Sequence, residues 1–414
     1  MFARWYESAL RSKLAKPYVH LMFGARQTGK STLIRKLLPA GTLEIDLADP
    51  SVRSRYLTEP ERLIAECRRL PRRRGGAYVF VDEAQSVPAM FDAVQSLYDR
   101  DKRRWRFVLC GSSARKLRKT GANLLPGRSF LHHLFPLTLT ERPPIPSGVS
   151  HAGSPLEFPW REKKPPTRRF PAADLETRLA FGELPGIAAA PEQDRHELLR
   201  AYAIVHLEEE IRREAMVKDW AAFLRFLRLA ATESGQTLNY AAISHETGLS
   251  QPTVKSHYQL LEDMFIGFPI AAWSGSPRKH LLSTPRFLLF DLGLRHAAAD
   301  LTPSRDVVRA NPGPLFEQWV GIELWKRLQY LRTGTLHYLR TKDGAEVDFI
   351  IAREGALTPI EVKWTERPTP SDARHLLTFL REHPKTARHA YLICRCRLPM
   401  RLHDNVTALP WFCL

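Results

Sequence analysis

The chain has 414 residues, of which 44% are hydrophobic, so it is long and apolar enough for two or three globular domains. Its formal net charge of +18 predicts a polyanionic partner, nucleic acid rather than a membrane, and the alternative is a soluble basic protein without such a partner. Five scattered cysteines without zinc-type spacing argue against a disulfide framework and favour the cytoplasm, and no apolar run reaches the ~18 residues of a membrane span.

The first motif follows an apolar run at residues 19–23, which predicts a buried strand, and it precedes a helix predicted for residues 32–38. The motif satisfies the pattern G-x-x-x-x-G-K-S/T of a phosphate-binding loop, the P-loop. Its glycines allow a tight turn that brings backbone N–H groups onto phosphate oxygens. We predict that Lys30 reaches the β- and γ-phosphates of ATP and that the Ser31 hydroxyl binds Mg²⁺. The predicted nucleotide-binding residues are Gly24, Ala25, Arg26, Gln27, Thr28, Gly29, Lys30, Ser31 and Thr32.

Two acids, Asp82 and Glu83, end an apolar strand that is predicted to begin at residue 78. Ligands bind at the carboxyl edge of a parallel sheet, so we predict that Asp82 holds Mg²⁺ and that Glu83 polarises the attacking water. A further strand, predicted for residues 105–111, ends in two serines. We favour Ser112 as the residue that orients water against the γ-phosphate, whereas Ser113 suits a helix N-cap.

Arg128 follows a Pro-Gly turn, which would fix the direction of its side chain. An arginine held in this way can act as a finger that neutralises transition-state charge in the site of a neighbouring subunit. The alternative is an ordinary solvated arginine on the surface.

Four motifs together carry a family resemblance, at residues 24–31, 81–85, 111–113 and 126–128. They resemble a group of AAA-type ATP-binding proteins of bacteria and archaea whose C-terminal domain was long of unknown function. The resemblance implies ATP and Mg²⁺ as cofactors, an ATPase core over residues 1–140, a helical lid over 173–218 and a homo-oligomeric ring such as a hexamer. The Pro-rich stretch 141–172 departs from the family pattern and is predicted to be an insertion or linker.

Residues 219–290 have the pattern of a winged helix, in which a helix-turn-helix is followed by strands. A short helix over 240–247 closes at Gly248, and Ser250 would cap a second helix over 251–264. The alternative is a winged helix that only packs domains or subunits together. The residues predicted to contact DNA are Gln251, Thr253, Lys255 and Ser256 on the second helix, and Arg278 and Lys279 at the tip of the wing.

The last predicted domain covers residues 311–414 and begins at a Pro-Gly-Pro breaker. Asp348 lies on one predicted strand and Glu361 and Lys363 on the next, with Glu317 on the preceding helix, which is the arrangement of PD-(D/E)xK nucleases. Glu361 and Lys363 are two apart on a strand and share a face, where Asp348 on the adjacent strand can meet Glu361. The two carboxylates can then bind Mg²⁺ together, and Glu317 can complete the site. Lys363 would orient or deprotonate the water that attacks phosphorus. The alternative is an exposed strand with alternating charge.

We therefore predict an α/β protein with a P-loop AAA-type ATPase core, a helical lid, a winged-helix segment and a C-terminal restriction-endonuclease-like α/β domain. The predicted function is that of an ATP-hydrolysing motor that binds and remodels duplex or branched DNA, as in repair or recombination. A metal-dependent nuclease-like domain would bind or cut that DNA. One alternative keeps the DNA-remodelling motor but makes the C-terminal domain a non-cleaving DNA-binding module. Another is a nucleotide-gated regulator that acts through protein contacts.

Overall fold

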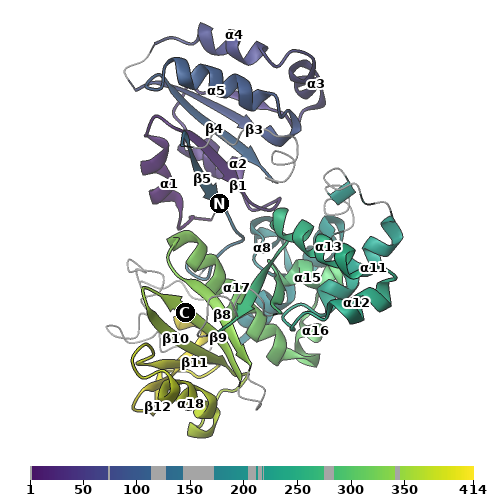
Figure 1. Cartoon of the computed structure of the whole chain (residues 1–414), viewed down its shortest axis with the longest axis vertical. Helices are drawn as coiled ribbons and strands as arrows, with labels where there is room; N and C mark the ends of the chain where they lie inside the picture. Colours follow the sequence, from purple (N-terminus) through teal and green to yellow (C-terminus); the bar gives the residue numbers. More distant parts are fainter. Residues whose placement is uncertain are drawn as a thin grey trace. The chain divides into compact units, whose positions relative to one another are not determined.

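The chain forms two compact units, labelled by element in Figure 1. The first unit consists of Met1–Pro136 with Leu260–Ile266, and the second of Leu137–Gln259 with Gly267–Leu414. The computed structural model describes residues 2–72, 75–112, 127–142, 172–203, 211–212, 217, 219–274, 284–340 and 346–414.

The first unit is built on a five-stranded parallel sheet with the order β2-β3-β4-β1-β5 (Figure 1). The strands are β1 Val19–Phe23, β2 Leu43–Asp46, β3 Ala77–Asp82, β4 Trp105–Gly111 and β5 Ser129–His133. Strand β1 is buried at every position, as expected for a central parallel strand, and it occupies the residues predicted for it. Strand β5 was not predicted, because its sequence mixes polar and apolar residues without a continuous apolar run.

The core of this unit lies between one face of the sheet and the helices α3, α4 and α5. The helices of the unit are α1 Glu7–Leu14, α2 Lys30–Leu37, α3 Pro50–Thr58, α4 Arg62–Arg69 and α5 Met90–Arg100, with a short 3-10 helix η1 at Ala84–Ser86. Asp49 caps α3 by accepting hydrogen bonds from the backbone N–H groups of Ser51 and Val52. The segment between β2 and β3 therefore begins with a capped helix and holds two helices, α3 and α4.

The second unit contains an eight-stranded mixed sheet with the order β12-β13-β11-β10-β9-β8-β6-β7. Its strands are β6 Gly267–Ala272, β7 Arg286–Leu289, β8 Thr335–Arg340, β9 Glu346–Arg353, β10 Ala356–Val362, β11 Ala390–Cys394, β12 Met400–His403 and β13 Val406–Pro410. Strand β6 pairs antiparallel with β7 and parallel with β8. The strands predicted for the wing and those predicted for the C-terminal domain therefore share one sheet.

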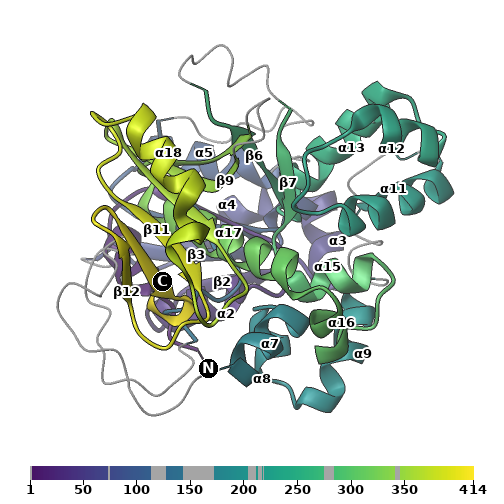
Figure 2. The same ribbon diagram turned by 90° about the horizontal axis from the view of Figure 1, so that it is seen from below.

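The second unit also contains α-helices on both sides of β6 and β7 in the sequence. They are α7 Ala172–Phe181, α8 Pro185–Ala189, α9 Arg195–Ala201, α11 Trp220–Thr232, α12 Tyr240–Thr247, α13 Gln251–Asp263, α15 Leu292–Ala298, α16 Arg305–Ala310, α17 Pro312–Leu331 and α18 Arg374–Glu382. Helices α11 and α12 lie together, and α18 lies beside β11 (Figure 1, Figure 2). Helices α7 and α9, in the predicted lid, pack on α15. Residues 204–210, 213–216 and 218 of the predicted lid lie outside the described residues.

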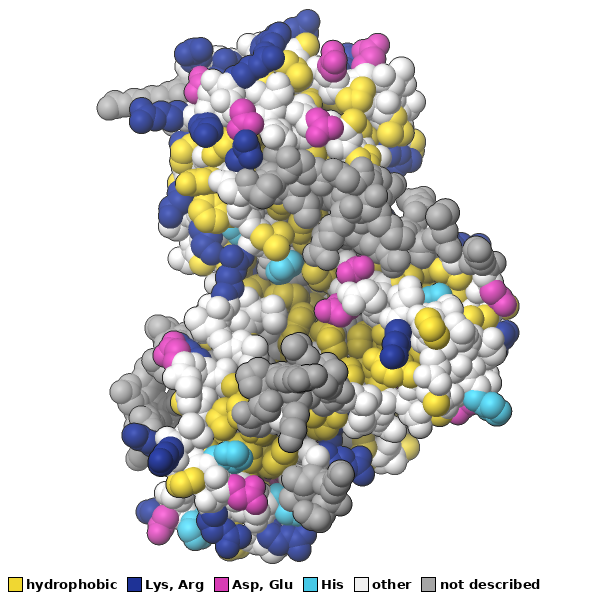
Figure 3. Space-filling model, in the orientation of Figure 1, with side chains coloured by type: hydrophobic (Ala, Val, Ile, Leu, Met, Phe, Trp, Pro, Cys, Tyr) yellow, Lys and Arg dark blue, Asp and Glu magenta, His cyan; other side chains and the backbone are white. Residues whose placement is uncertain are grey.

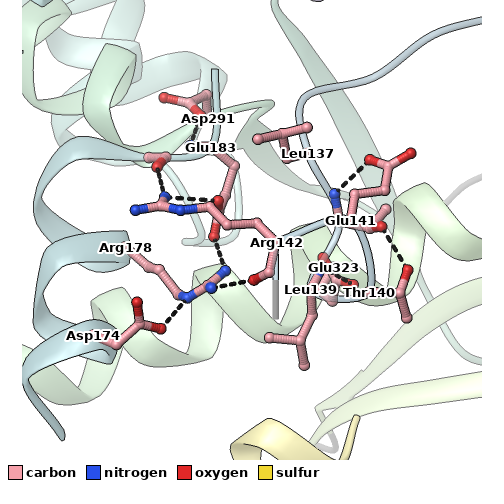
Figure 4. A network of polar contacts seen from close by, with 12 residues as sticks. Leu137, Leu139, Thr140, Glu141, Arg142, Asp174, Arg178, Glu183, Asp291 and Glu323 are labelled. Atoms are coloured by element: carbon pink, nitrogen blue, oxygen red, sulfur yellow. Dashed lines mark hydrogen bonds and ion pairs between the residues drawn. The ribbon is translucent and has the colours of Figure 1, made fainter. Parts of the chain in front are cut away.

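Helix α17 begins at Pro312, so the predicted breaker is in fact the first turn of this helix. Proline is tolerated there because the first backbone N–H groups of a helix have no partner within it. Toward the other end of α17, buried Glu323 accepts from the backbone N–H of Leu139 at 2.9 Å, and Lys326 donates to the carbonyl of Leu137 at 2.5 Å. These contacts fasten the first residues of the second unit to α17, and Figure 4 labels Leu137, Leu139 and Glu323 among them.

Candidate functional site

The P-loop joins β1 to α2, and its backbone requires glycine at two positions. Gly24 has a φ of +150°, and a Cβ placed there would lie 2.2 Å from the carbonyl oxygen of Leu134. Gly29 has a left-handed φ of +88° at the N-terminus of α2. The buried Lys30 ammonium donates to the carbonyls of Gly24 and Ala25, both at 2.8 Å. The loop therefore has the shape and the cation of a phosphate-binding site.

Arg4 braces this loop from the N-terminal segment, a role that sequence reasoning missed. Its side chain is buried and donates to the carbonyls of Thr28 and Phe135, each at 2.6 Å. The Thr28 hydroxyl donates in turn to the carbonyl of Ala25 at 2.9 Å. No local motif surrounds Arg4, so the sequence offers no signal for this contact.

Ser31 and Asp82, the two predicted magnesium ligands of this site, contact each other. Burial raises the pKa of Asp82, and a hydrogen bond from the Ser31 hydroxyl opposes that rise. Arg35 on α2 lies 3.6 Å from Asp82 and 3.6 Å from Asp46 at the neighbouring strand end. A hydroxyl beside a carboxylate at the phosphate end of the loop fits Mg²⁺, whose preferred ligands are oxygens.

Glu83 is held by Gln85, the last residue of the motif at 81–85, to which the sequence assigned no role. The Gln85 amide nitrogen donates to Glu83 Oε2 at 2.6 Å and to the Ser112 hydroxyl at 3.1 Å. A Cβ at Gly111 would lie 2.5 Å from Gln85 Oε1, so glycine makes room for the amide. Arg26 approaches the same carboxylate, at 3.9 Å. The structure thus joins Glu83 and Ser112, whereas Ser113 lies outside the described residues.

Arg128 is far from the P-loop of its own chain along the sheet. Its carbonyl accepts from the backbone N–H of Val19, at the first residue of β1, whereas the P-loop follows the last residue of that strand. The Arg128 side chain donates to Asp99 at 2.7 Å. A role in a neighbouring subunit stays a prediction.

The helices α12 and α13 have the turn geometry predicted between them. Gly248 ends α12 with a left-handed φ of +73°, and the Ser250 hydroxyl accepts from the backbone N–H of Thr253 at 3.3 Å. Val254 and Tyr258 are buried. Of the residues predicted to contact DNA, Gln251, Lys255 and Ser256 are exposed, Thr253 is half-buried, and Arg278 and Lys279 lie outside the described residues.

The second unit brings the predicted nuclease residues together. Asp348 on β9 accepts from the backbone N–H of Val362 at 2.8 Å, and the Lys363 ammonium lies 2.8 Å from Glu361 Oε1. Glu361 is 4% exposed, and its second oxygen, Oε2, receives no hydrogen bond from any residue that the structure describes. Such an orphaned carboxylate oxygen fits a bound cation.

The acids of this cluster have raised pKa values, because they are buried and lie near one another's charges. Burial, with a contribution from Asp348, raises the pKa of Glu317 to about 8 and that of Glu361 to about 7. Burial also raises the pKa of Asp348, against the hydrogen bond from Val362. Burial lowers the pKa of Lys363, but the Glu361 carboxylate outweighs it and the net shift is upward. These mutual effects place Glu317, Asp348 and Glu361 in one electrostatic group.

Arg286 is the member of this cluster that the sequence did not reveal. Its guanidinium lies 2.8 Å from Glu317 and also binds Glu346. Among the residues that the structure describes, no three His, Cys, Asp or Glu side chains are grouped to hold a metal ion. Asp348 and Glu361 fit as two ligands, but the third candidate, Glu317, is paired with Arg286.

Figure 3 shows how the Lys and Arg side chains of the described residues are distributed over one face of the molecule. Lys and Arg side chains are spread around the first unit, with acidic side chains among them. In the described part of the chain, no helix is long and apolar enough to cross a membrane.

Residues 16–142 match the family model of an AAA domain. Residues 172–305 and 312–414 match two domains of unknown function, DUF8612 and DUF4143. The chain therefore has an AAA-type ATPase domain at its N-terminus and a DUF4143 domain at its C-terminus, as the motifs indicated. An AAA domain implies nucleotide binding, typically together with Mg²⁺.

Two relatives extend the similarity across the chain. Uncharacterized proteins of Mycobacterium bovis and Mycobacterium tuberculosis are each 26% identical over 404 residues, which is 97% of this chain and 82% of each relative. Protein VC1899 from Vibrio cholerae, a solved structure, is 12% identical over 95% of this chain and 94% of that chain, with a TM-score of 0.18. A score this low supports no argument about the fold.

Proposed function

We propose that this protein hydrolyses ATP at the site formed by the P-loop, Asp82 and Glu83. Lys30 would move from the loop carbonyls to the β- and γ-phosphates, and Ser31 and Asp82 would hold Mg²⁺, which supplies charge neutralisation when bound. Glu83 would accept the proton of the attacking water. Ser112 would hydrogen-bond that water or the γ-phosphate.

One observation carries this proposal. The Gln85 amide links Glu83 to Ser112, so the acid expected to activate water and the serine expected to orient it are held together. Ser31 binds Asp82 beside them, at the end of the same strand. A nucleotide-binding fold used only for gating has no need of a buried link between these two residues.

The test uses two variants of the full chain. Lys30→Ala should lose both ATP binding and hydrolysis, whereas Glu83→Gln should bind ATP with unchanged affinity and lose turnover by about a hundredfold or more. Lys36→Ala is the matched control, since Lys36 is a lysine of the same helix that pairs with Glu7 on the surface. Hydrolysis at the wild-type rate in both site variants would show that the site is misassigned.

We propose as a second function that the C-terminal cluster acts on DNA phosphodiesters with a divalent cation, so that the protein is an ATP-driven DNA-processing motor. Support comes from Glu361, whose buried Oε2 suits a cation, and from Lys363, placed beside it to orient a water. The net charge of +18 favours a nucleic-acid partner. The helices α12 and α13, taken as a winged helix, would contact DNA, duplex or branched, in a ring of subunits.

Incubation of labelled duplex and branched DNA with Mg²⁺ or Mn²⁺ tests this function. Asp348→Ala and Lys363→Ala should lose cleavage, and Glu366→Ala, an exposed acid beyond the cluster, should keep it. Equal cleavage products from wild type and the two cluster variants would show that the cluster does not cleave DNA. DNA-stimulated ATP hydrolysis without cleavage would leave a remodelling motor. Absence of salt-sensitive DNA binding would favour a regulator that acts through protein contacts.

A further inference from the structure

Arg286 is a buried cation at the start of β7, and other elements fix its position. The side chain is 6% exposed, and its guanidinium binds Glu317 on α17 at 2.8 Å and Glu346 on β9. The ring of Tyr338 on β8 lies 4.5 Å from the guanidinium carbon. The hydroxyl of Tyr338 donates to the carbonyl of Thr284 at 2.7 Å, two residues before Arg286, so the ring also holds the start of β7. Contacts from α17, β8 and β9 therefore converge on one guanidinium.

The acids that Arg286 neutralises belong to the same cluster as the predicted metal ligands. Glu346 and Asp348 are two residues apart on β9, so they face the same side of the sheet. Glu317 and Asp348 repel each other, and the charge of Arg286 acts on both. The positive charge of Arg286 thus already acts on Asp348 without a metal.

The cluster contains two kinds of carboxylate. Glu317, which is half-buried, has a cation partner in Arg286, and removing that partner leaves an uncompensated charge unless another cation replaces it. Glu361 has a cation, Lys363, on one oxygen, while its other oxygen is buried and receives no hydrogen bond from the described residues. One acid is therefore satisfied without metal and the other is not.

We propose that Arg286 is the internal counter-ion of this cluster, and that Glu317 exchanges it for a divalent cation when the cluster binds metal. The proposal rests on the metal-dependent function proposed for the C-terminal domain. Arg286 is a positioning residue: it holds Glu317 in place without metal and weakens metal binding by competing for the same carboxylate. Metal binding would therefore also change the contacts of β7: the guanidinium released by Glu317 would remain on that strand and keep its contact with Glu346.

The test measures Mn²⁺ binding to the nucleotide-free full chain by electron paramagnetic resonance. Because Ser31 and Asp82 offer a second Mn²⁺ site, each protein is compared with its own Asp348→Ala counterpart, and the difference reports the cluster. Arg286→Gln should bind Mn²⁺ about tenfold more tightly than wild type, because one repelling charge is gone. Arg286→Lys should fall between the two, since a lysine keeps the charge but loses the planar two-pronged contact.

Two further variants separate this effect from damage to the fold. Arg286→Gln leaves Glu317 and Glu346 without a cation, so its folding is checked by circular dichroism. Arg286→Lys keeps the positive charge and therefore tests the proposal even if Arg286→Gln does not fold. Adding Glu317→Gln to Arg286→Gln should cancel the gain in affinity, because the carboxylate released to the metal is absent. Arg327→Gln is the matched control: it breaks a buried pair with Glu323 on the same helix and should leave Mn²⁺ affinity unchanged.

Two results overturn the proposal, and they are distinguishable. If wild type binds Mn²⁺ through Asp348 but Arg286→Gln and Arg286→Lys bind it equally or more weakly, Arg286 is not a competing counter-ion. If no protein, including the Arg286 variants, shows Mn²⁺ binding that depends on Asp348, the metal-dependent function proposed for the cluster fails together with the exchange.

Discussion

The P-loop site and the carboxylate cluster both combine acids with cations, but they neutralise their charges in different ways. In the P-loop site, Lys30 donates to backbone carbonyls, and Asp82 and Glu83 accept hydrogen bonds from the neutral side chains of Ser31 and Gln85. Their arginine neighbours, Arg35 and Arg26, lie farther away, at 3.6 Å and 3.9 Å. In the cluster, by contrast, the cations of Lys363 and Arg286 bind carboxylates directly, each at 2.8 Å.

This difference predicts different responses to a charged ligand. A phosphate approaching the P-loop meets an ammonium that donates to the uncharged carbonyls of Gly24 and Ala25. A metal approaching the cluster must displace Arg286 from Glu317 before a third carboxylate becomes available. The first site is prepared for its ligand, whereas the second is balanced internally, and each of the following experiments disturbs one side of that contrast.

The largest effect is expected from Gly24→Ala in the P-loop. The new Cβ would lie 2.2 Å from the carbonyl of Leu134, at a φ of +150° that side chains rarely adopt. We expect loss of nucleotide binding and a stability cost of about 3 kcal/mol, measured by fluorescent-nucleotide titration and by thermal melting.

The control for this variant is Gly75→Ala, where an added Cβ meets no atom of the described structure within 4 Å. It should bind nucleotide like wild type. Normal nucleotide affinity in Gly24→Ala would mean that nucleotide binding does not depend on the present shape of the loop. The P-loop site would then not differ from the cluster in being prepared for its ligand.

A smaller effect is expected from Gln85→Ala, which removes the link between Glu83 and Ser112. The two residues would still be present but no longer held together, so kcat for ATP should fall about ten- to a hundredfold while nucleotide affinity stays the same. Steady-state hydrolysis and equilibrium binding, measured on one preparation, separate the two quantities.

Gln85→Glu sharpens the same experiment. It keeps the size of the side chain but places a second carboxylate beside Glu83, where two negative charges repel. Turnover should therefore be at least as low as in Gln85→Ala. Wild-type turnover in both variants would show that the position of Glu83 does not depend on residue 85.

The features predicted correctly from the sequence are those carried by neighbouring residues. The P-loop occupies nine consecutive positions between a strand and a helix, and β1 and β4 span the residues predicted for them. Asp348, Glu361 and Lys363 also lie together, on or directly after two strands that follow each other in the chain, and strand periodicity indicated the shared face of Glu361 and Lys363.

The features that were missed depend on distant parts of the chain. Arg4 reaches Thr28 across 24 residues, and Arg286 reaches Glu317 across 31. Neither arginine belongs to a periodic pattern or a motif, and in a chain with 62 Lys and Arg residues nothing local distinguishes them. Their roles arise only when the sheets form and bring their partners together.

The smallest effect concerns the pH dependence of stability, and it reports on the cluster. Burial and Asp348 raise the pKa of Glu317 from 4.5 in the unfolded chain to about 8, so the folded protein holds this proton more tightly than the unfolded chain. Its stabilising contribution is complete below pH 4.5 and is lost as the pH rises through 8. In chelator-treated protein, the melting temperature of Glu317→Gln should therefore rise relative to wild type between pH 5 and pH 8.

Glu192→Gln provides the control with the opposite shift. The hydrogen bond from Arg305 lowers the pKa of Glu192, so this acid is ionised in both folded and unfolded chains across the same pH range. Its difference from wild type should be constant there. A constant difference for Glu317→Gln as well would mean that Arg286 keeps Glu317 ionised throughout. The cluster would then be neutralised by its ion pair alone rather than by a shared proton, and metal binding would release Arg286 without releasing a proton.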